Sequence, residues 1–301
     1  MSFFITIFTP TYNRGYIIEK LYKSLQAQTC MNFEWIIIDD GSTDNTEYII
    51  NQWLKDENKF KIRFFKTENR GKQRAINTAV NLASYDYFFC VDSDDKLTPD
   101  AIENVITWLP DIHKKDEFAG VSGLRRILNR HYSKPFFEKV EYIDCTNIER
   151  YKYNIDCDCA EIYKTNILKK YPFKVWEGET FTPECIVWDA IAIDGYKLRW
   201  YNSYIYECEY LDDGLTNGGY NLYSKNLMGC AMANNIKIET ANSYKRILFL
   251  ILEICISCIL SNNISYLRQT KFPIIAYLLL PISIPFALRR KSIIKKFCNR
   301  K

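Results

Sequence analysis

Residues 3–54 read FFITIFTPTYNRGYIIEKLYKSLQAQTCMNFEWIIIDDGSTDNTEYIINQWL and contain one pattern twice: a short apolar run, a polar loop, and a stripe at helical spacing. The apolar runs are Phe3–Phe8 and Trp35–Ile38, and the stripes lie within Ile17–Leu25 and Thr46–Leu54. The runs are continuous rather than alternating, as expected of strands that are covered on both faces. Strands and helices that alternate at this spacing form right-handed βαβ units. The sequence therefore predicts an α/β fold with a mostly parallel sheet flanked by helices.

The pattern continues through the first hundred residues. Ile62–Phe65 and Tyr87–Val91 are further apolar runs, Ala75–Ala83 carries a third stripe, and a fourth helix is expected to begin with Thr98 as N-cap and Pro99 after it. In open α/β sheets, ligands bind beyond the carboxyl ends of the strands. We therefore expect the site to be formed by the four polar loops there, at residues 10–14, 39–44, 67–72 and 92–96.

Composition and charge exclude several classes of protein. The 301 residues are 48% hydrophobic and 25% charged, which excludes disordered and collagen-like chains. Residues 289–301 hold seven of the 40 lysines and arginines and none of the 36 acidic residues, so residues 1–288 carry a net charge of about −3. A body of this charge does not indicate nucleic-acid binding, whereas the basic tail favours anionic membrane surfaces. Met1–Thr9 has no basic leader, and we expect a first strand there rather than a signal peptide.

The 11 cysteines have no repeated spacing, which is typical of reduced thiols in a cytoplasmic compartment. The nearest approach to a zinc motif is residues 157–159 (CDC), with His113 and His131 elsewhere in the chain. Tetrahedral zinc usually takes two separated pairs of ligands. We therefore do not expect a zinc site.

Three carboxylates, those of Asp92, Asp94 and Asp95, follow the fourth apolar run within four residues. They would repel one another and raise one another's pKa, and a divalent cation relieves that repulsion. Oxygen ligands without nearby His or Cys select Mg²⁺ or Mn²⁺, which commonly bridges substrate phosphates. A calcium loop is excluded because Lys96 and Leu97 occupy positions that need a ligand and a turn glycine. We expect a metal–diphosphate site, with a solvated turn that caps the next helix as the alternative.

Other phosphate-binding motifs are missing from the sequence. It contains neither GxGxxG nor GxxxxGK[ST], which argues against a dinucleotide dehydrogenase and a P-loop NTPase. Asp39 and Asp40 also end an apolar run. One acidic residue suffices to start the next helix, and Asp44 accounts for that role, so the cap does not explain Asp39 and Asp40. A second carboxylate could accept a hydrogen bond from a nucleotide base, and Tyr12 on the neighbouring loop could stack on that base.

Four motifs occur in order, at residues 9–14 (TPTYNR), 39–44 (DDGSTD), 69–77 (NRGKQRAIN) and 92–100 (DSDDKLTPD). Together they resemble the family 2 glycosyltransferases, which have the Rossmann-like GT-A fold. The middle of the chain resembles a bacterial surface-polysaccharide subgroup, through residues 158–165, 176–189 and 209–216. The resemblance implies a metal-dependent hexosyl- or N-acetylhexosaminyl-transferase that uses a nucleotide-diphosphate donor, commonly a UDP-sugar, and a glycan or lipid-linked acceptor.

The resemblance also implies residue roles. Tyr12 and Asp40 would hold the nucleotide base, and Asp92 and Asp94 would be the DXD pair that contacts the ribose and binds Mn²⁺ or Mg²⁺. Lys72 would lie near the diphosphate or the sugar, with a solvated helix start as the alternative. The implied donor-binding set, in which Arg14 is alternatively a surface residue, is Thr9, Pro10, Tyr12, Arg14, Asp40, Lys72, Asp92, Ser93 and Asp94.

The catalytic base implied by the resemblance departs from the family pattern. Inverting members place a Glu-Asp pair at the start of a helix, whereas this chain has Glu184 followed by Cys185. Glu184 is the expected base and Asp189 the second candidate, and Glu184 is alternatively a first-turn carboxylate that the helix dipole favours. The implied reaction is a single displacement with inversion, in which the base removes the acceptor proton and the metal neutralises the departing nucleoside diphosphate.

We expect residues 1–110 to bind the donor, residues 111–216 to form the acceptor and catalytic half of the same GT-A domain, and residues 217–301 to form a helical region with a basic tail. Two other functions stay open. A non-catalytic nucleotide-sugar-binding relative is suggested by Cys185. A nucleotidyltransferase would need a basic, glycine-rich loop after the first strand, which residues 10–14 do not supply.

The last part of the chain contains two apolar stretches, Ile247–Leu260 and Phe272–Leu288. The second is interrupted by Pro281 and Pro285, and its 17 residues would span about 25 Å, short of a hydrocarbon core of about 30 Å. Because prolines at this density break a straight helix, we expect an interfacial or re-entrant segment at the cytoplasmic face of the cell membrane, peripheral or monotopic. The alternative is a soluble helical cap.

Overall fold

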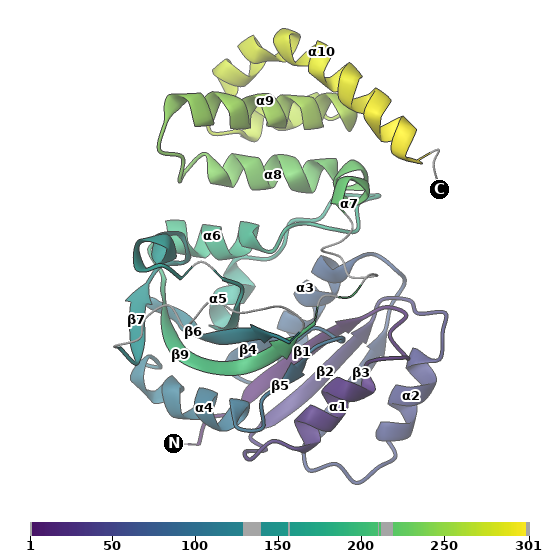
Figure 1. The fold of residues 1–301 in the computed structure, drawn as a ribbon, viewed down its shortest axis with the longest axis vertical. Coiled ribbons are helices and arrows are strands. Elements are labelled where there is room, and N and C mark those ends of the chain that lie inside the picture. The colour runs from purple at the N-terminus through teal and green to yellow at the C-terminus, as the bar shows by residue number, and fades with distance from the viewer. Residues whose placement is uncertain (1, 129–139, 156, 210, 212–218, 299–301) are drawn as a thin grey trace. The chain divides into compact units, whose positions relative to one another are not determined.

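The computed structural model describes residues 2–128, 140–155, 157–209, 211 and 219–298 (Figure 1). The chain forms two compact units, Met1–Pro172 with Ile191–Tyr210, and Phe173–Ala190 with Leu211–Lys301. Residues 173–190 thus group with the C-terminal helices. The division into a donor half, an acceptor half and a tail stays a prediction.

The first unit is built on a nine-stranded sheet (Figure 1) in the order β3-β2-β1-β4-β8-β6-β9-β5, with β7 paired to β9. The strands are β1 (Ile5–Thr11), β2 (Phe33–Asp39), β3 (Lys61–Lys66), β4 (Tyr87–Cys90), β5 (Lys96–Leu97), β6 (Phe118–Ile127), β7 (Tyr142–Cys145), β8 (Cys159–Lys164) and β9 (Lys197–Cys208). The four strands predicted from the first hundred residues are the parallel half, β3-β2-β1-β4. β8 runs antiparallel to both β4 and β6, so the sheet as a whole is mixed. The α/β fold class is confirmed, and the parallel order holds for the first half.

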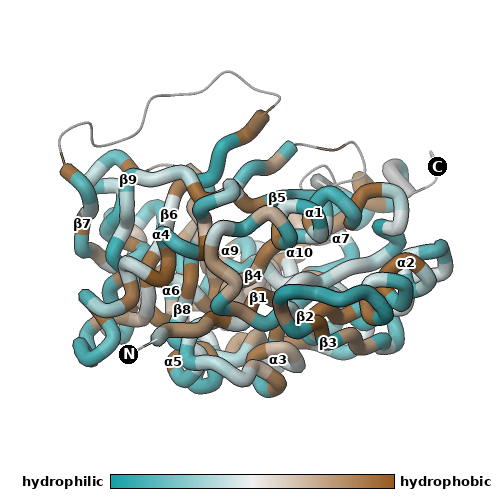
Figure 2. The backbone as a smooth tube through the Cα atoms, turned by 90° about the horizontal axis from the view of Figure 1, so that it is seen from below, coloured by the Kyte–Doolittle hydropathy of each residue, from teal (hydrophilic) through white to brown (hydrophobic). Residues whose placement is uncertain are grey.

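Alternate side chains of the parallel strands pack on opposite faces of the sheet. Ile5, Ile7, Trp35, Ile37 and Phe89 lie in one core cluster with the apolar faces of three helices, α1 (Glu19–Gln26), α2 (Thr46–Trp53) and α4 (Ala101–Trp108). Two further helices, α3 (Lys72–Leu82) and α5 (Thr165–Lys170), contact each other on the other side, and Figure 2 shows the central strands β1, β2 and β4 as largely apolar. Covered faces explain why these strands have continuous apolar runs.

α4 begins two residues later than expected. Asp100 takes the N-cap position that the sequence predicts for Thr98. The reason is a turn at residues 98–101, in which Thr98 O accepts a hydrogen bond from Ala101 N (3.1 Å) and Thr98 Oγ1 donates one to Asp100 Oδ1 (2.8 Å). Two 3₁₀ segments, Leu109–Asp111 and Asn147–Tyr153, complete the described elements of this unit.

The second unit is helical. It contains most of α6 (Cys185–Ile193) and all of α7 (Gly219–Lys225), α8 (Leu227–Lys237), α9 (Tyr244–Leu260), a 3₁₀ segment (Ile264–Gln269) and α10 (Pro273–Cys298). α9 contacts both α8 and α10 and supplies five of the eleven buried residues of their shared core. The Arg290 guanidinium of α10 forms a bidentate ion pair with Glu253 of α9, with N–O distances of 2.5 and 2.9 Å.

The expected break in the second apolar stretch is wrong. α10 is one helix of 26 residues that includes Pro281 and Pro285, and at 1.5 Å per residue it spans about 39 Å. Each proline removes one main-chain hydrogen bond, and the remaining turns are held by packing against α9. Among the described residues, Pro273–Lys296 is the one helix long and apolar enough to cross a membrane, with a mean hydropathy of 1.3.

Candidate functional site

The polar loops meet at the carboxyl edge of the parallel half of the sheet, as predicted. The main-chain hydrogen bonding of the strands continues into these loops, from Asp40 N to Thr11 O, from Thr67 N to Asp39 O and from Val91 N to Phe8 O, each 2.8 Å long. The parallel register puts Thr11 beside Asp39, at the ends of β1 and β2. Loops that are far apart in the sequence are therefore side by side at one edge.

The acidic loop after β4 is held by two side chains from other elements. Lys72 Nζ, at the start of α3, lies 2.6 Å from Asp92 Oδ1. The Tyr206 hydroxyl, on β9, accepts a hydrogen bond from Asp92 N (3.0 Å) and donates one to Asp95 Oδ2 (2.7 Å). The Arg125 guanidinium lies 4.2 Å from the centre of the Tyr206 ring. Both ends of the acidic loop are thus fixed by one buried hydroxyl.

The three carboxylates differ in pKa. Burial and then the charge of Asp92 raise the pKa of Asp94 above its usual range, and the same two causes raise the pKa of Asp95 to about 7. Burial alone would also raise the pKa of Asp92, but the positive charges of Lys72 and Arg125 outweigh it and lower that pKa. The predicted mutual repulsion is therefore present at Asp94 and Asp95, while Asp92 is stabilised as the anion.

Asp40 holds the start of α3 in place. Its Oδ1 accepts a hydrogen bond from Arg70 N (2.9 Å) and its Oδ2 one from Gly71 N (2.8 Å). Burial raises the pKa of Asp40. Gly71 has a φ of 98°, a region that favours glycine, and it immediately precedes Lys72. Asp40 thus positions the helix that carries Lys72, a role that the sequence does not reveal.

The loop after β1 is joined to the loop after β2 by the side chain of Asn13, a residue whose backbone is in the left-handed region. Asn13 has a φ of 52°, and its Oδ1 accepts a hydrogen bond from Thr43 N (2.8 Å). Asp44 stabilises the same junction, because its Oδ2 accepts from Gly15 N (3.0 Å) while its Oδ1 accepts from Thr46 N (3.0 Å). Tyr12, between these tied positions, has an exposed side chain.

The remaining predicted donor residues lie in different surroundings. Thr9 is fully buried, and its Oγ1 accepts a hydrogen bond from Trp35 Nε1 (2.9 Å), so its side chain belongs to the core. Pro10 is half-buried and Ser93 is buried, each next to the edge of the sheet. Arg14 Nη1 donates to the Tyr16 hydroxyl (3.0 Å). The charge of Arg14 helps to lower the pKa of Asp92 and offsets part of the rise in the pKa of Asp94. Arg14 is therefore electrostatically part of the acidic site.

The candidate base residues Glu184 and Asp189 belong to the second unit. Glu184 immediately precedes α6, and its carbonyl oxygen accepts a hydrogen bond from Val187 N (3.0 Å). Burial and then the charge of Asp189 raise the pKa of the Cys185 thiol, with Glu184 contributing in the same direction. Cys185 is consequently a neutral thiol at pH 7 and not a proton acceptor.

The segment before Glu184 is clamped to the start of α8. The carboxylate of Glu179 accepts hydrogen bonds from Met228 N (2.7 Å) and Gly229 N (2.9 Å), the amides of the second and third residues of that helix. In return, Asn226 Oδ1 accepts from Thr180 N (2.9 Å) and Phe181 N (2.8 Å). The side chains of Glu179 and Asn226, 47 residues apart, thus accept hydrogen bonds from four main-chain amides. These bonds fix the course of the chain towards α6.

Two residues with structural roles described above, Tyr206 and Asn226, could not be predicted from the sequence. Tyr206 and Asn226 lie more than 100 residues from the first-half motifs and belong to no pattern that indicates a site. Residues 209–216 contribute to the predicted resemblance, but Tyr210 and residues 212–218 lie outside the described residues.

The residues that could hold a metal ion are few. In the part of the chain that the structure describes, no cluster of three or more His, Cys, Asp or Glu side chains could bind one. Asp92 and Asp94 are two carboxylates whose repulsion a cation would relieve. They fit a hard ion that takes its other ligands from phosphate and water. Of the two histidines, His113 Nδ1 lies 3.0 Å from the Tyr87 hydroxyl, and His131 is outside the described residues.

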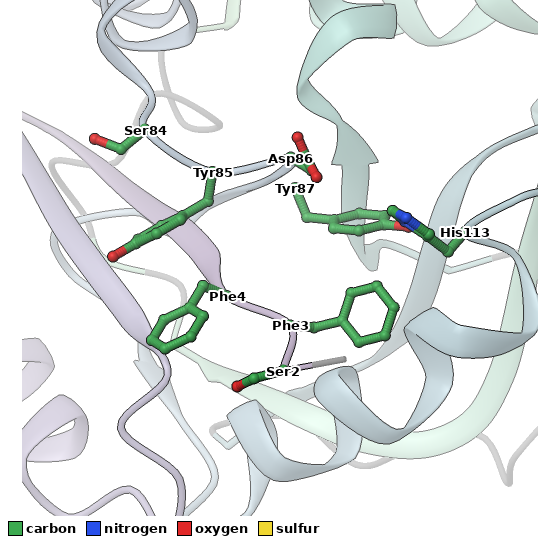
Figure 3. Close-up of a pocket in the computed structure, with 8 residues that line it drawn as sticks. All are labelled: Ser2, Phe3, Phe4, Ser84, Tyr85, Asp86, Tyr87 and His113. Carbon is green, nitrogen blue, oxygen red and sulfur yellow. The ribbon is translucent and has the colours of Figure 1, made fainter.

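A pocket of about 220 Å³ lies at the opposite end of the strands (Figure 3). Its walls include Phe3, Phe4, Tyr85 and Tyr87, with the Phe3 ring edge-on to His113 at 5.0 Å and Phe4 stacked on Tyr85 at 5.2 Å. None of the predicted site residues lines it. We therefore place the candidate site at the carboxyl edge of the sheet and not in this pocket.

Comparison with known proteins identifies the family. A family model described as Glycosyl transferase family 2 matches residues 6–172, which is more than half of the 301 residues. The chain belongs to glycosyl transferase family 2. The matched segment contains all the motifs of the first four loops, so the resemblance derived from them is confirmed.

Curated relatives of this family 2 chain include two synthases. The poly-beta-1,6-N-acetyl-D-glucosamine synthases of Staphylococcus aureus (strain COL) and Staphylococcus epidermidis are 34% and 27% identical to it over 204 and 205 residues. Each alignment covers 65% of this chain and 47% of the synthase. The chain thus spans about half the length of the curated relatives it matches.

Solved structures with the same fold include two proteins in complex with nucleotide sugars. Residues 1–349 of S. aureus TarS, solved with UDP-GlcNAc, superpose with a TM-score of 0.61 at 15% identity, covering 99% of this chain and 92% of that one. The mannosyltransferase PcManGT from Pyrobaculum calidifontis, solved with GDP-Man and Mn²⁺, gives a TM-score of 0.54 at 17% identity, covering 97% and 83%. At these identities the likeness shows the fold, and the predicted GT-A fold is confirmed.

Proposed function

We propose that this family 2 chain transfers a sugar from a nucleotide-diphosphate donor to a glycan or lipid-linked acceptor in cell-surface polysaccharide synthesis. The observation that carries the proposal is the acidic loop of residues 92–95, fixed at the carboxyl edge of the parallel strands next to the Asp40 and Lys72 loops. The synthase relatives make poly-β-1,6-N-acetylglucosamine and TarS binds UDP-GlcNAc, which favours UDP-GlcNAc as the first donor to test.

In this proposal the exposed ring of Tyr12 stacks on the nucleotide base, and Asp40 both contacts the base and anchors α3. Each Asp40 oxygen already accepts one amide hydrogen bond, and a carboxylate oxygen can accept a second. Lys72 and Arg14 supply positive charge for the diphosphate. Thr9 contributes through its backbone and through the buried contact with Trp35, because its side chain lies in the core.

Mn²⁺ or Mg²⁺ is the proposed cofactor, with Asp92 and Asp94 as its protein ligands. When bound, such an ion stabilises the charge of the departing nucleoside diphosphate. Lys72 holds Asp92 as an anion before the ion arrives. Tyr206 keeps the loop in one conformation, so that Asp94 is presented without a further ordering cost.

Glu184 is the proposed base that accepts the acceptor's hydroxyl proton, and Asp189 is the second candidate. Cys185 stands at the usual aspartate position but is kept neutral by its raised pKa, so it does not compete for the role. The clamp between Glu179 and Asn226 fixes the segment that leads to Glu184. A direct displacement with one base inverts the configuration of the anomeric carbon.

We also propose that α10 associates with the cytoplasmic face of the membrane. Ile274, Leu278 and Ile282, spaced four residues apart, are exposed by 76, 71 and 56%, and they form a continuous apolar stripe along one side of the helix. Basic residues follow the stripe, namely Arg289, Lys291, Lys295 and Lys296. An apolar stripe combined with basic side chains favours an anionic lipid surface.

The activity is tested by nucleoside-diphosphate release. The purified 301-residue chain is supplied with UDP- and GDP-sugars, Mn²⁺ and a glycan acceptor, and release is measured for each donor. The proposal expects release from UDP-GlcNAc or another UDP-sugar that Asp94→Asn abolishes. Binding of the donor without release, in the presence of acceptor, would instead support the non-catalytic alternative. Pyrophosphate release from a nucleoside triphosphate would support a nucleotidyltransferase.

A further inference from the structure

Two cysteines lie in contact in the first unit, outside the proposed donor site. Cys157 Sγ and Cys159 Sγ are 3.5 Å apart, and either sulfur can donate a hydrogen bond to the other. Cys157 is half-buried at the end of a loop, whereas Cys159, the first residue of β8, is 3% exposed. The proposed transfer reaction uses neither thiol.

An arginine supplies positive charge beside this pair. Arg150 Nη2 donates a hydrogen bond to Cys157 O (2.5 Å), and its Nε donates one to Ile155 O (3.0 Å). The guanidinium also lies 5.4 Å from the centre of the Trp200 ring. Two carbonyl oxygens and an aromatic ring therefore fix its position. The thiol of Cys157 is therefore partly accessible and has a guanidinium beside it, a combination found at reactive cysteines, while Asp158 and Glu161 are the acidic neighbours that oppose this positive charge.

Two other thiols of the first unit, those of Cys145 and Cys208, provide a contrast. The hydrogen bond with Cys159 and then the charge of Arg150, against the effect of burial, lower the pKa of Cys157. Burial instead raises the pKa of Cys145 and of Cys208 to about 12. A thiolate is the nucleophilic form of cysteine, so Cys157 is set apart from these two thiols by charge as well as by position.

We propose that Cys157 and Cys159 form a reversible dithiol–disulfide site whose oxidant is a hydroperoxide. The Cys157 thiolate attacks the terminal peroxide oxygen, the O–O bond breaks, and a sulfenic acid and an alcohol (water, from hydrogen peroxide) form. The Cys159 sulfur then attacks the Cys157 sulfur, the S–S bond forms, and water leaves with the Cys159 proton. One hydroperoxide thus oxidises two thiols, and a dithiol reductant restores them by exchange.

The backbone allows this closure at low cost. A disulfide needs its sulfurs at about 2.05 Å, so the two atoms must approach by about 1.5 Å from the observed 3.5 Å. Cys159 pairs with Leu124 at the very end of the β6–β8 ladder. Asp158 between the two cysteines is exposed. The movement therefore falls on a loop and a ladder end, and it leaves the interior pairing of the sheet intact.

The test counts thiols in the full chain. Folded protein is treated with hydrogen peroxide, the remaining thiols are alkylated, and the modified peptides are mapped by mass spectrometry. We expect the loss of two alkylation sites, both at residues 157–159, and their recovery after dithiothreitol. Cys145→Ser should leave that pair of losses unchanged. Loss of thiols elsewhere while Cys157 and Cys159 stay alkylated would overturn the proposal.

A second variant separates the two steps. In Cys159→Ser the resolving sulfur is missing, so Cys157 should stop at the sulfenic acid and form a covalent adduct with dimedone. In Cys157→Ser no adduct should form at Cys159. Adduct formation at Cys159 in Cys157→Ser, or none at Cys157 in Cys159→Ser, would contradict the assigned order. None of these readouts requires transferase activity, so the result is independent of the proposed function.

Discussion

Tyr206 donates a 2.7 Å hydrogen bond to the carboxylate of Asp95, 111 residues earlier in the chain. The same hydroxyl accepts from the N–H of Asp92, so β9 determines the conformation of the loop that carries the acidic residues. Since the aromatic ring is fully buried, the hydroxyl group has little freedom to move. The second half of the sheet thus positions residues that come from the first half.

Replacing this hydroxyl should weaken donor binding. Tyr206→Phe keeps the ring but leaves the Asp95 carboxylate and the Asp92 amide without their partner, at a cost of about 1–3 kcal/mol. We expect roughly tenfold weaker binding of UDP-GlcNAc, measured by calorimetry. Tyr204→Phe, on the same strand, is the control and should bind as the wild type does. A lower melting temperature in Tyr206→Phe with unchanged donor affinity would show that the residue acts on stability alone.

Glu184→Gln should abolish the chemical step but not donor binding. Loss of a general base costs about 10²- to 10⁴-fold in rate, and we expect that fall in kcat with an unchanged donor Kd. Asp189→Asn is the matched control and should keep most of the activity. The opposite pattern, with Glu184→Gln active and Asp189→Asn inactive, would exchange the two assignments.

Glu34 should make stability dependent on pH. This carboxylate is buried at the β1–β2 contact and accepts hydrogen bonds from Ser84 N (2.7 Å), Thr6 Oγ1 (2.9 Å) and Arg63 Nη1 (3.2 Å). Burial alone would raise the pKa of Glu34, but these donors together lower it. A lowered pKa contributes stability that is fully present above the unfolded value of about 4.3 and is lost as the pH falls through the folded value.

Glu34→Gln should therefore lower the free energy of unfolding at pH 7 by about 1–3 kcal/mol. Below pH 4.3 the melting temperature of the variant should also fall less steeply with pH than that of the wild type. Thermal unfolding from pH 3 to pH 7 measures both effects. Glu57→Gln, at an exposed position, should unfold as the wild type does at every pH. Parallel pH profiles of Glu34→Gln and the wild type would refute the stated cause.

The stripe on α10 should bind lipid. Leu278→Asp removes an apolar contact of about 2 kcal/mol and adds a negative charge, so we expect at least tenfold less protein to sediment with phosphatidylglycerol vesicles. Asn242→Asp adds the same charge at an exposed position outside the stripe and should sediment normally. Equal sedimentation of the two variants would mean that α10 does not face the membrane.

The sequence is sufficient to predict the parallel half of the sheet, because β1, β2 and β4 are buried on both faces and leave continuous apolar runs, and the half-buried edge strand β3 follows at the same spacing. The same logic locates the acidic loop, since carboxyl ends of parallel strands meet at one edge. The mixed half is not predictable in this way. β8 and β9 are joined to the sheet by antiparallel and irregular pairing, for which the order of elements carries no fixed hand.

The residues that contact the site from distant parts of the chain cannot be predicted from sequence patterns, for a physical reason. The acidic motif does not specify which distant hydroxyl will reach Asp95, because that contact depends on how β5 pairs with β9. The continuity of α10 through two prolines likewise depends on packing against α9 and not on local propensity. Local rules therefore identify the loops, and tertiary contacts decide the geometry within them.

The most direct test of the account is cation-dependent donor binding. Calorimetric titration of the 301-residue chain with UDP-GlcNAc, with and without Mn²⁺, should show saturable binding that requires the ion. Asp94→Asn should remove that requirement together with most of the affinity, whereas Asp100→Asn, at the exposed N-cap of α4 beyond β5, should bind as the wild type does. Equal binding with and without Mn²⁺, in the wild type and in Asp94→Asn alike, would contradict the account.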